Sequence, residues 1–205
     1  MRIKSVVLLL VFLLAAVPAF ALDFDFNGTF QYDNDVVLMN FTVGADSTIT
    51  IFSSSWDDGG FDPILAIWDT SGAYINEQDD GHVTGSTLSN GTSYDHGKWD
   101  SYYSIFLGTG NYIASIAQYD NFREGNALSD GFIYDDNPNF TYDEGYGTED
   151  YFNGVLSDTD ARTGDWAFHI LNVEAASVDP VPEPATFILL GSGLAGLAFY
   201  RRKRK

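Results

Sequence analysis

Acidic side chains are the residues of this sequence whose types and spacing most directly suggest chemistry. Carboxylates recur in short clusters beside Gly or Asn, and four of them are candidate metal ligands: Asp62, Asp79, Asp80 and Asp100. Calcium takes about six to eight hard oxygen ligands, often from loops that bend around the ion. We therefore expect a calcium site that uses Asp79 and Asp80, with Asp62 or Asp100 nearby. In the alternative interpretation the same acids are turn residues and solubilising surface charge.

Side chains that could catalyse a reaction are few. The three histidines, His82, His96 and His169, lack the spacing of zinc ligands, and the chain has neither a cysteine nor a G-x-S-x-G element for a serine nucleophile. With so many carboxylates, one close pair arises by chance and does not indicate a glycosidase. We therefore expect that the protein is not an enzyme, and a secreted glycan hydrolase remains the least favoured alternative.

Aromatic side chains are the second kind of candidate ligand-binding residue. Trp68 and Trp166 fall in predicted strands and are expected in the core, whereas Trp56 and Trp99 fall in loops beside acidic residues. An exposed aromatic ring can stack on a sugar, while a neighbouring carboxylate accepts hydrogen bonds from the hydroxyl groups of that sugar. Trp56 and Trp99 are therefore the candidate sugar-binding residues if the domain is a carbohydrate-binding module.

Charge and composition limit the partners. The chain has 205 residues, with 29 Asp and Glu against 10 Lys and Arg, and 45% of its residues are hydrophobic. That apolar content predicts a folded domain, and the negative charge argues against nucleic acid as a partner. Residues 22–180 hold 28 acidic and 3 basic residues, a net charge of about −25. A small domain with this charge repels itself unless cations screen it, which favours calcium.

The two ends of the chain are predicted to be targeting segments. Residues 1–21 combine a basic start, an apolar run and Ala19-Phe20-Ala21, the parts of a secretory signal peptide. At the other end, residues 179–205 contain Pro182-Glu183-Pro184, an uncharged stretch at 185–200 and a basic tail at 201–205. We expect residues 185–200 to span the inner membrane as a single helix, with the basic tail in the cytoplasm.

The C-terminal segment resembles the PEP-CTERM sorting signal of Gram-negative bacteria that make exopolysaccharide. The resemblance depends on Pro182, Glu183 and Pro184, the glycine-bearing apolar stretch and the basic end, which occur in that order. It implies transient recognition by an exosortase, a membrane transpeptidase, and then delivery to the cell surface or the extracellular space.

The middle of the chain predicts an all-β domain over residues 22–178. No segment shows sustained helical periodicity, and short alternating or apolar runs are separated by turn-forming residues. Predicted strands cover 22–26, 36–43, 47–53, 63–68, 102–107, 111–117 and 165–173. Gly108–Asn111 indicates a tight hairpin. Residues 120–163 are expected to form long loops with at most one strand pair. This pattern is typical of a jelly-roll-like antiparallel β-sandwich.

Residues 22–120 resemble the bacterial pre-peptidase C-terminal (PPC) domain, a jelly-roll β-sandwich. The matching stretches are 34–43, 60–69, 78–81 and 110–112. The resemblance implies association with calcium, polysaccharide or other surface proteins. Together, these observations predict an exported protein with a structural or adhesive role in an extracellular polysaccharide.

Overall fold

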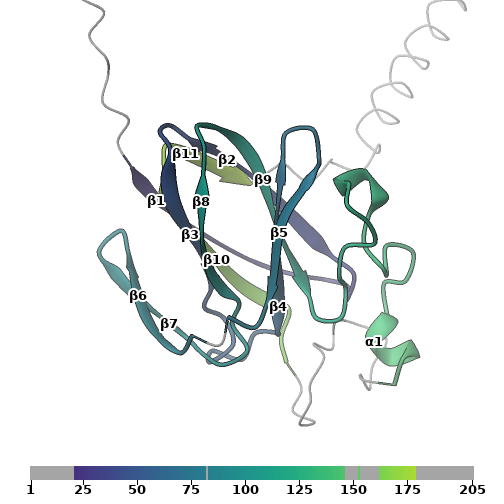
Figure 1. Ribbon diagram of the computed structural model, residues 1–205. Helices are drawn as coiled ribbons and strands as arrows, with labels where there is room; N and C mark the ends of the chain where they lie inside the picture. Colours follow the sequence, from purple (N-terminus) through teal and green to yellow (C-terminus); the bar gives the residue numbers. More distant parts are fainter. Residues whose placement is uncertain (1–20, 82, 146–151, 153–161, 179–205) are drawn as a thin grey trace, which may run out of the picture.

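Two antiparallel sheets packed face to face form the body of the protein in the computed structural model (Figure 1). The structure describes residues 21–81, 83–145, 152 and 162–178. The predicted sorting segment and, apart from Ala21, the predicted signal peptide lie outside these residues. The prediction of an all-β antiparallel sandwich is confirmed.

The strands divide between two main sheets and one separate hairpin. The first sheet has the order β1 (Leu22–Thr29), β10 (Asp165–Val173), β3 (Ser47–Ser53) and β8 (Tyr102–Leu107). The second has the order β11 (Ala175–Val178), β2 (Val36–Val43), β9 (Gly110–Gln118), β4 (Pro63–Asp69) and β5 (Tyr74–Asp79). The hairpin consists of β6 (Gly85–Ser89) and β7 (Thr92–His96), and two short helices are η1 (Leu128–Asp130) and α1 (Phe140–Asp143).

The hydrophobic core lies between the two sheets. In β10, Trp166, Phe168 and Ile170 point into it and are at most 6% exposed, as their alternation with Ala167, His169 and Leu171 predicts. Leu65 and Ile67 of β4 contribute from the other sheet. The outward residue His169 is nevertheless only 1% exposed, because the β6–β7 hairpin covers that face. The Tyr94 ring lies tilted against the His169 ring, with ring centroids 4.1 Å apart.

The predicted hairpin at Gly108–Asn111 is wrong. The strands on either side, β8 and β9, belong to different sheets, so the short turn crosses the edge of the sandwich. Asp46 fixes this crossing by accepting a 2.8 Å hydrogen bond from the Thr109 amide, and the Tyr112 hydroxyl donates to the Gly108 carbonyl at 2.9 Å. Packed sheets are only about 10 Å apart, so a few residues suffice to connect them.

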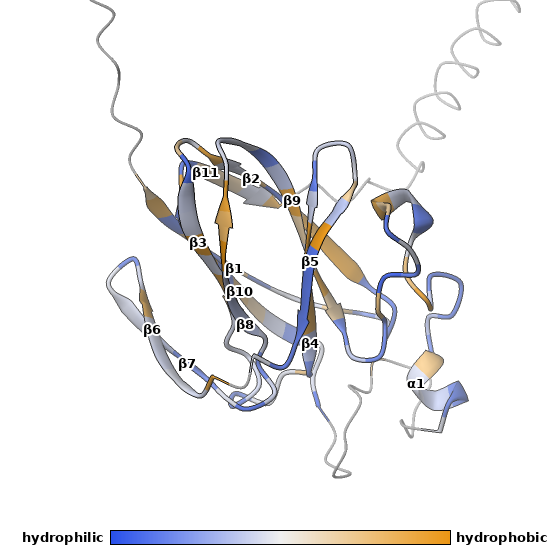
Figure 2. Cartoon of the chain, in the orientation of Figure 1, coloured by the Kyte–Doolittle hydropathy of each residue, from blue (hydrophilic) through white to orange (hydrophobic). Residues whose placement is uncertain are grey.

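Sequence reasoning missed the polar strands β5, β6, β7 and β11. In Figure 2 much of β5 is hydrophilic, and all of its residues are only partly buried, as suits an edge strand. The turn between β6 and β7 is Asn90-Gly91, and both residues have positive φ, 47° and 82°. Asn-Gly is a strong hairpin signal, so this pair could have been found from the sequence.

The segment after β9 packs as loops against the second sheet. Phe132 contacts Trp68 edge to face, with ring centroids 6.2 Å apart, and covers the outer side of β4. In the described part of 120–163, strand-like pairing is limited to the isolated bridges Ala73↔Ala127 and Arg123↔Phe132. The expectation of long loops therefore holds for the described residues.

Candidate metal centre

The pairing of β4 with β5 assembles the predicted acidic ligands. The two strands run antiparallel with Ile64 opposite Asp79, so the residue before β4 meets the residues that end β5. Oxygen atoms of Asp62, Asp79 and Asp80 come within 4.8 Å of one another. The structure thus brings together three of the four carboxylates that the sequence singled out.

Asp62 has the most unusual environment of the three. Its side chain is 8% exposed, and its Oδ1 atom is buried without a hydrogen-bond partner among the described residues. Burial, followed by repulsion from Asp80 and Asp79, raises the pKa of this carboxyl to about 8. A buried carboxylate without compensation is costly, and a cation between these oxygens would remove that cost.

The turn after β5 holds the other two acids in place. The Gln78 side-chain amide donates to the carbonyls of Asp79 and Asp80, at 3.1 and 2.8 Å. Asp80 has a φ of 56°, a left-handed conformation that Asp adopts more readily than most residues. At Gly81 the chain passes so close to Tyr102 that an added Cβ would lie 2.4 Å from its amide nitrogen. This turn is therefore tightly specified.

Asp100 is near this cluster without belonging to it, contrary to its prediction as a ligand. Its charge contributes to the raised pKa of Asp62, but both of its own carboxylate oxygens accept hydrogen bonds. It accepts hydrogen bonds from the Ser53 hydroxyl at 2.8 Å and from the amides of Gly97, at 2.8 Å, and Ser55, at 3.2 Å. Asp100 is 0% exposed and organises the loop after β3, a structural role.

Gln118 is a polar neighbour that sequence reasoning missed. It pairs with Pro63, the residue after Asp62, and is 0% exposed. Neither its amide oxygen nor its amide nitrogen has a partner among the residues that the structure describes. An amide oxygen is of the type that calcium binds, and the backbone pairing with Pro63 places Gln118 on the strand next to Asp62. Nothing in the local sequence marks it, because it ends an otherwise ordinary buried strand.

The expected exposure of Trp56 is wrong. Its side chain is 9% exposed, because the Arg162 guanidinium lies 3.3 Å from the ring centroid and also donates to the Trp56 carbonyl at 2.7 Å. Trp99 is half-buried, tilted against Trp56 at 5.9 Å, with the Lys98 ammonium 3.8 Å from its ring centroid. The two candidate rings lie against each other. The Arg162 and Lys98 side chains, however, cover ring faces on which a sugar would have to stack.

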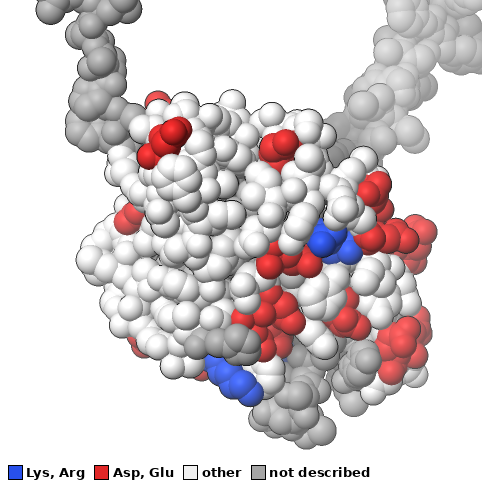
Figure 3. Space-filling view, viewed as in Figure 1, with Lys and Arg blue, Asp and Glu red and all other residues white. Residues whose placement is uncertain are grey.

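The donor set of the acidic cluster suits a hard cation. All its candidate ligand atoms are oxygens, which calcium and magnesium prefer, and cysteine is absent from the chain. Figure 3 shows acidic side chains spread over the visible face, with few basic ones. The fold and this cluster define the class of protein: an acidic, all-β sandwich domain with a carboxylate cluster at one end of a sheet.

The comparison with protein families bears on how this domain is delivered. Residues 180–205 match the model of the PEP-CTERM protein-sorting motif. The motif supports export, sorting to the cell surface and processing by an exosortase, as the sequence predicted. A search of curated proteins found no match to the chain. The resemblance of residues 22–120 to the PPC domain stays a prediction.

No helix within the described ranges is long and apolar enough to cross a membrane. The span predicted at residues 185–200 lies outside those ranges.

Proposed function

We propose that this protein is a calcium-stabilised structural or adhesive component of an extracellular polysaccharide. Asp62, Asp79 and Asp80 would hold the calcium ion, and the PEP-CTERM motif would bring the domain to the surface where that polymer lies. The observation that carries the proposal is the buried Oδ1 of Asp62, which has no hydrogen-bond partner among the described residues and faces two further carboxylates.

Charge provides independent support for a cation. A net charge of about −25 over residues 22–180 makes the domain repel itself, most strongly where acids converge. An ion held by three carboxylates lowers that repulsion at its strongest point. Calcium is also abundant outside cells, where modules bind it with dissociation constants of about 0.1–1 mM. Bound ions on an acidic surface can further bridge the protein to carboxylates of a polymer.

The experiment measures calcium binding by the full-length protein in mild detergent, using isothermal titration. We expect a dissociation constant of about 0.1–1 mM, and loss of the site in Asp62→Asn and Asp79→Asn. Asp136→Asn is the matched control, since it removes one exposed negative charge outside the cluster. Equal weakening of calcium binding in all three variants would mean that only the overall negative charge matters. Absence of calcium binding below about 1 mM would contradict the site.

A second measurement addresses the matrix role. Polysaccharide isolated from the producing cells is sedimented with the protein, in calcium and in chelator. We expect calcium to increase co-sedimentation of the wild type and to have less effect on Asp62→Asn. If calcium binds but co-sedimentation is absent in both conditions, the metal site stands and the adhesive role is wrong.

A further inference from the structure

Three side chains from distant parts of the chain form a hydrogen-bonded series across the outer face of the first sheet. Ser54 follows β3 directly, His169 lies in β10, and Asp25 lies in β1 opposite His169. The Ser54 Oγ is 2.8 Å from the His169 Nε2, and the His169 Nδ1 is 2.7 Å from the Asp25 Oδ1. This is the order of groups and the hydrogen-bond spacing of a serine nucleophile, its general base and the acid that orients the base.

The protonation states suit that arrangement. Burial raises the pKa of Asp25, but hydrogen bonds from Ser89, Asn90 and His169 outweigh it and lower the pKa overall, so the group is a carboxylate. It accepts the Nδ1 proton of His169. Burial lowers the pKa of His169, which keeps the imidazole neutral near pH 7. The Nε2 lone pair is then directed at the Ser54 hydroxyl and is free to accept its proton.

The imidazole is also held rigidly. Phe52 stacks on it with ring centroids 4.3 Å apart, and Tyr94 of the β6–β7 hairpin covers it at 4.1 Å. The hairpin is attached to the same acid, since the Ser89 hydroxyl and the Asn90 amide donate to the Asp25 carboxylate at 2.6 and 2.8 Å. A base fixed in one orientation needs little reorganisation when it takes up a proton.

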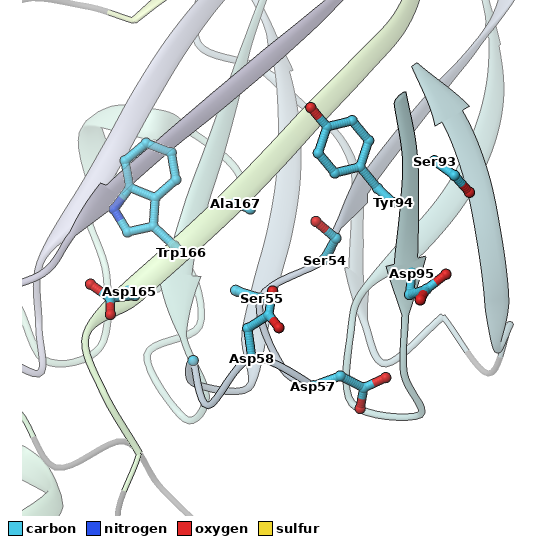
Figure 4. Close-up of a pocket in the computed structure, with 11 residues that line it drawn as sticks. Ser54, Ser55, Asp57, Asp58, Ser93, Tyr94, Asp95, Asp165, Trp166 and Ala167 are labelled. Carbon is cyan, nitrogen blue, oxygen red and sulfur yellow. The ribbon is translucent and has the colours of Figure 1, made fainter. Parts of the chain in front are cut away.

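Ser54 lies at a cleft of about 410 Å³ between the hairpin and β10 (Figure 4). Ser55, the next residue, also lines this cleft. Its hydroxyl is buried and has no hydrogen-bond partner within the described part of the chain. Because this hydroxyl oxygen is buried, it does not offer a donor to a substrate in the cleft.

We propose that this cleft is a hydrolytic site for carboxylic esters, in which Ser54 is the nucleophile, His169 the general base and Asp25 the positioning residue. The activity is separate from the calcium cluster and does not depend on the proposed function. It also departs from the expectation that the protein is not an enzyme.

The reaction proceeds by acyl transfer to the enzyme and then to water. The Ser54 Oγ attacks the ester carbonyl carbon while its proton passes to the His169 Nε2. The bond to the alcohol then breaks, and the alcohol leaves with the proton from His169. Water attacks the acyl-serine, His169 takes a proton from that water, the carboxylic acid is released, and the proton returns to Ser54.

The charge of the cleft indicates the substrate class. Four exposed carboxylates line the cleft, those of Asp57, Asp58, Asp95 and Asp165. In Figure 4 these side chains lie lower in the view than Ser54 and Tyr94. Among the described residues none of these four forms an ion pair with a basic side chain. Anionic esters are therefore repelled, and an ester of a neutral or cationic alcohol fits.

The test treats the full-length protein in mild detergent with a fluorophosphonate probe, which labels activated serines, and maps the label by mass spectrometry. We expect about one label per chain on Ser54, none after heat denaturation, and none in Ser54→Ala. Ser93→Ala is the matched control, because Ser93 lines the same cleft outside the hydrogen-bonded series. In His169→Asn, labelling should slow by at least ~100-fold.

The pH dependence of labelling separates a positioning role of Asp25 from a structural one. Labelling of the wild type should rise with pH as His169 deprotonates, with a midpoint below about 6.5. Asp25 is the charge that favours protonated His169, and His96 is the second titratable group that acts on it. In Asp25→Asn the midpoint should therefore move to lower pH. Absence of labelling in the folded wild type, or labelling that persists in Ser54→Ala, would overturn the proposal.

Discussion

The stability of this protein should decrease from acid to neutral pH when calcium is removed, because of Asp62. The pKa of its carboxyl is about 8 in the folded state against 3.8 ordinarily, so the folded protein binds a proton that the unfolded chain has released. Between those two values the unfolded state carries fewer protons, and the free energy of unfolding therefore falls as pH rises. The stabilisation from this group is fully present near pH 4 and is lost as pH approaches about 8.

The size of the effect follows from the same shift. Each pH unit in that window is worth ~1.4 kcal/mol, so the loss between about pH 5.5 and 7.5 is ~3 kcal/mol. For a domain of this size, that lowers the unfolding midpoint by ~6–12 °C. Bound calcium has the opposite effect on stability, because an ion bound to the carboxylates favours their charged forms. A concentration of about ten times its dissociation constant adds ~1.4 kcal/mol at neutral pH.

The assay is thermal unfolding followed by circular dichroism, at fixed ionic strength, in chelator, calcium or magnesium. Asp62→Asn is the decisive comparison, because its neutral amide mimics the protonated acid and leaves the other titrating groups in place. We expect the wild type to lose stability over this pH range in chelator and the variant to lose much less. Identical pH dependence of the two proteins would contradict this prediction, as would a calcium shift of equal size in both.

Three further predictions concern residues outside this titration. Asp100→Ala should destabilise the fold by ~3–5 kcal/mol in urea unfolding, because it leaves several buried donors without an acceptor; a loss under ~1 kcal/mol would contradict this. Gly81→Ala should weaken calcium binding and lower the unfolding midpoint, since its Cβ would clash with Tyr102, whereas Gly91→Ala, with nothing within 4 Å, should leave calcium affinity unchanged. Alanine substitution of residues 182–184 should leave the exported protein in the inner-membrane fraction on cell fractionation, and normal surface delivery would argue against the sorting motif.

Local patterns were sufficient for much of the sandwich. The strands 36–43, 47–53, 102–107 and 165–173 agree with the predicted bounds, because period-two alternation and apolar runs depend only on nearby residues. The acidic cluster was also accessible: Asp62, Asp79 and Asp80 stand out by type, and one antiparallel pairing brings them together. The sorting motif needs no fold at all, since it is a linear segment.

Pairing between distant strands required the tertiary structure. β8 and β9 belong to different sheets because each pairs with strands that are distant in the sequence. The turn between them does not indicate which sheet each strand joins. Asp100 and Trp56 have ordinary loop signals in the sequence, but long-range hydrogen bonds and the Arg162 guanidinium bury them.

The series Ser54, His169 and Asp25 shows the same division most clearly. His169 is 115 residues from Ser54 and 144 residues from Asp25, so no motif in the sequence connects them. They meet because β1, β10 and β3 are neighbours in one sheet and the β6–β7 hairpin covers that face. The targeting segments, the acidity and most of the apolar strands of this protein are readable from local sequence. Long-range burial, which sums contributions from the whole chain, decided which side chains share a site.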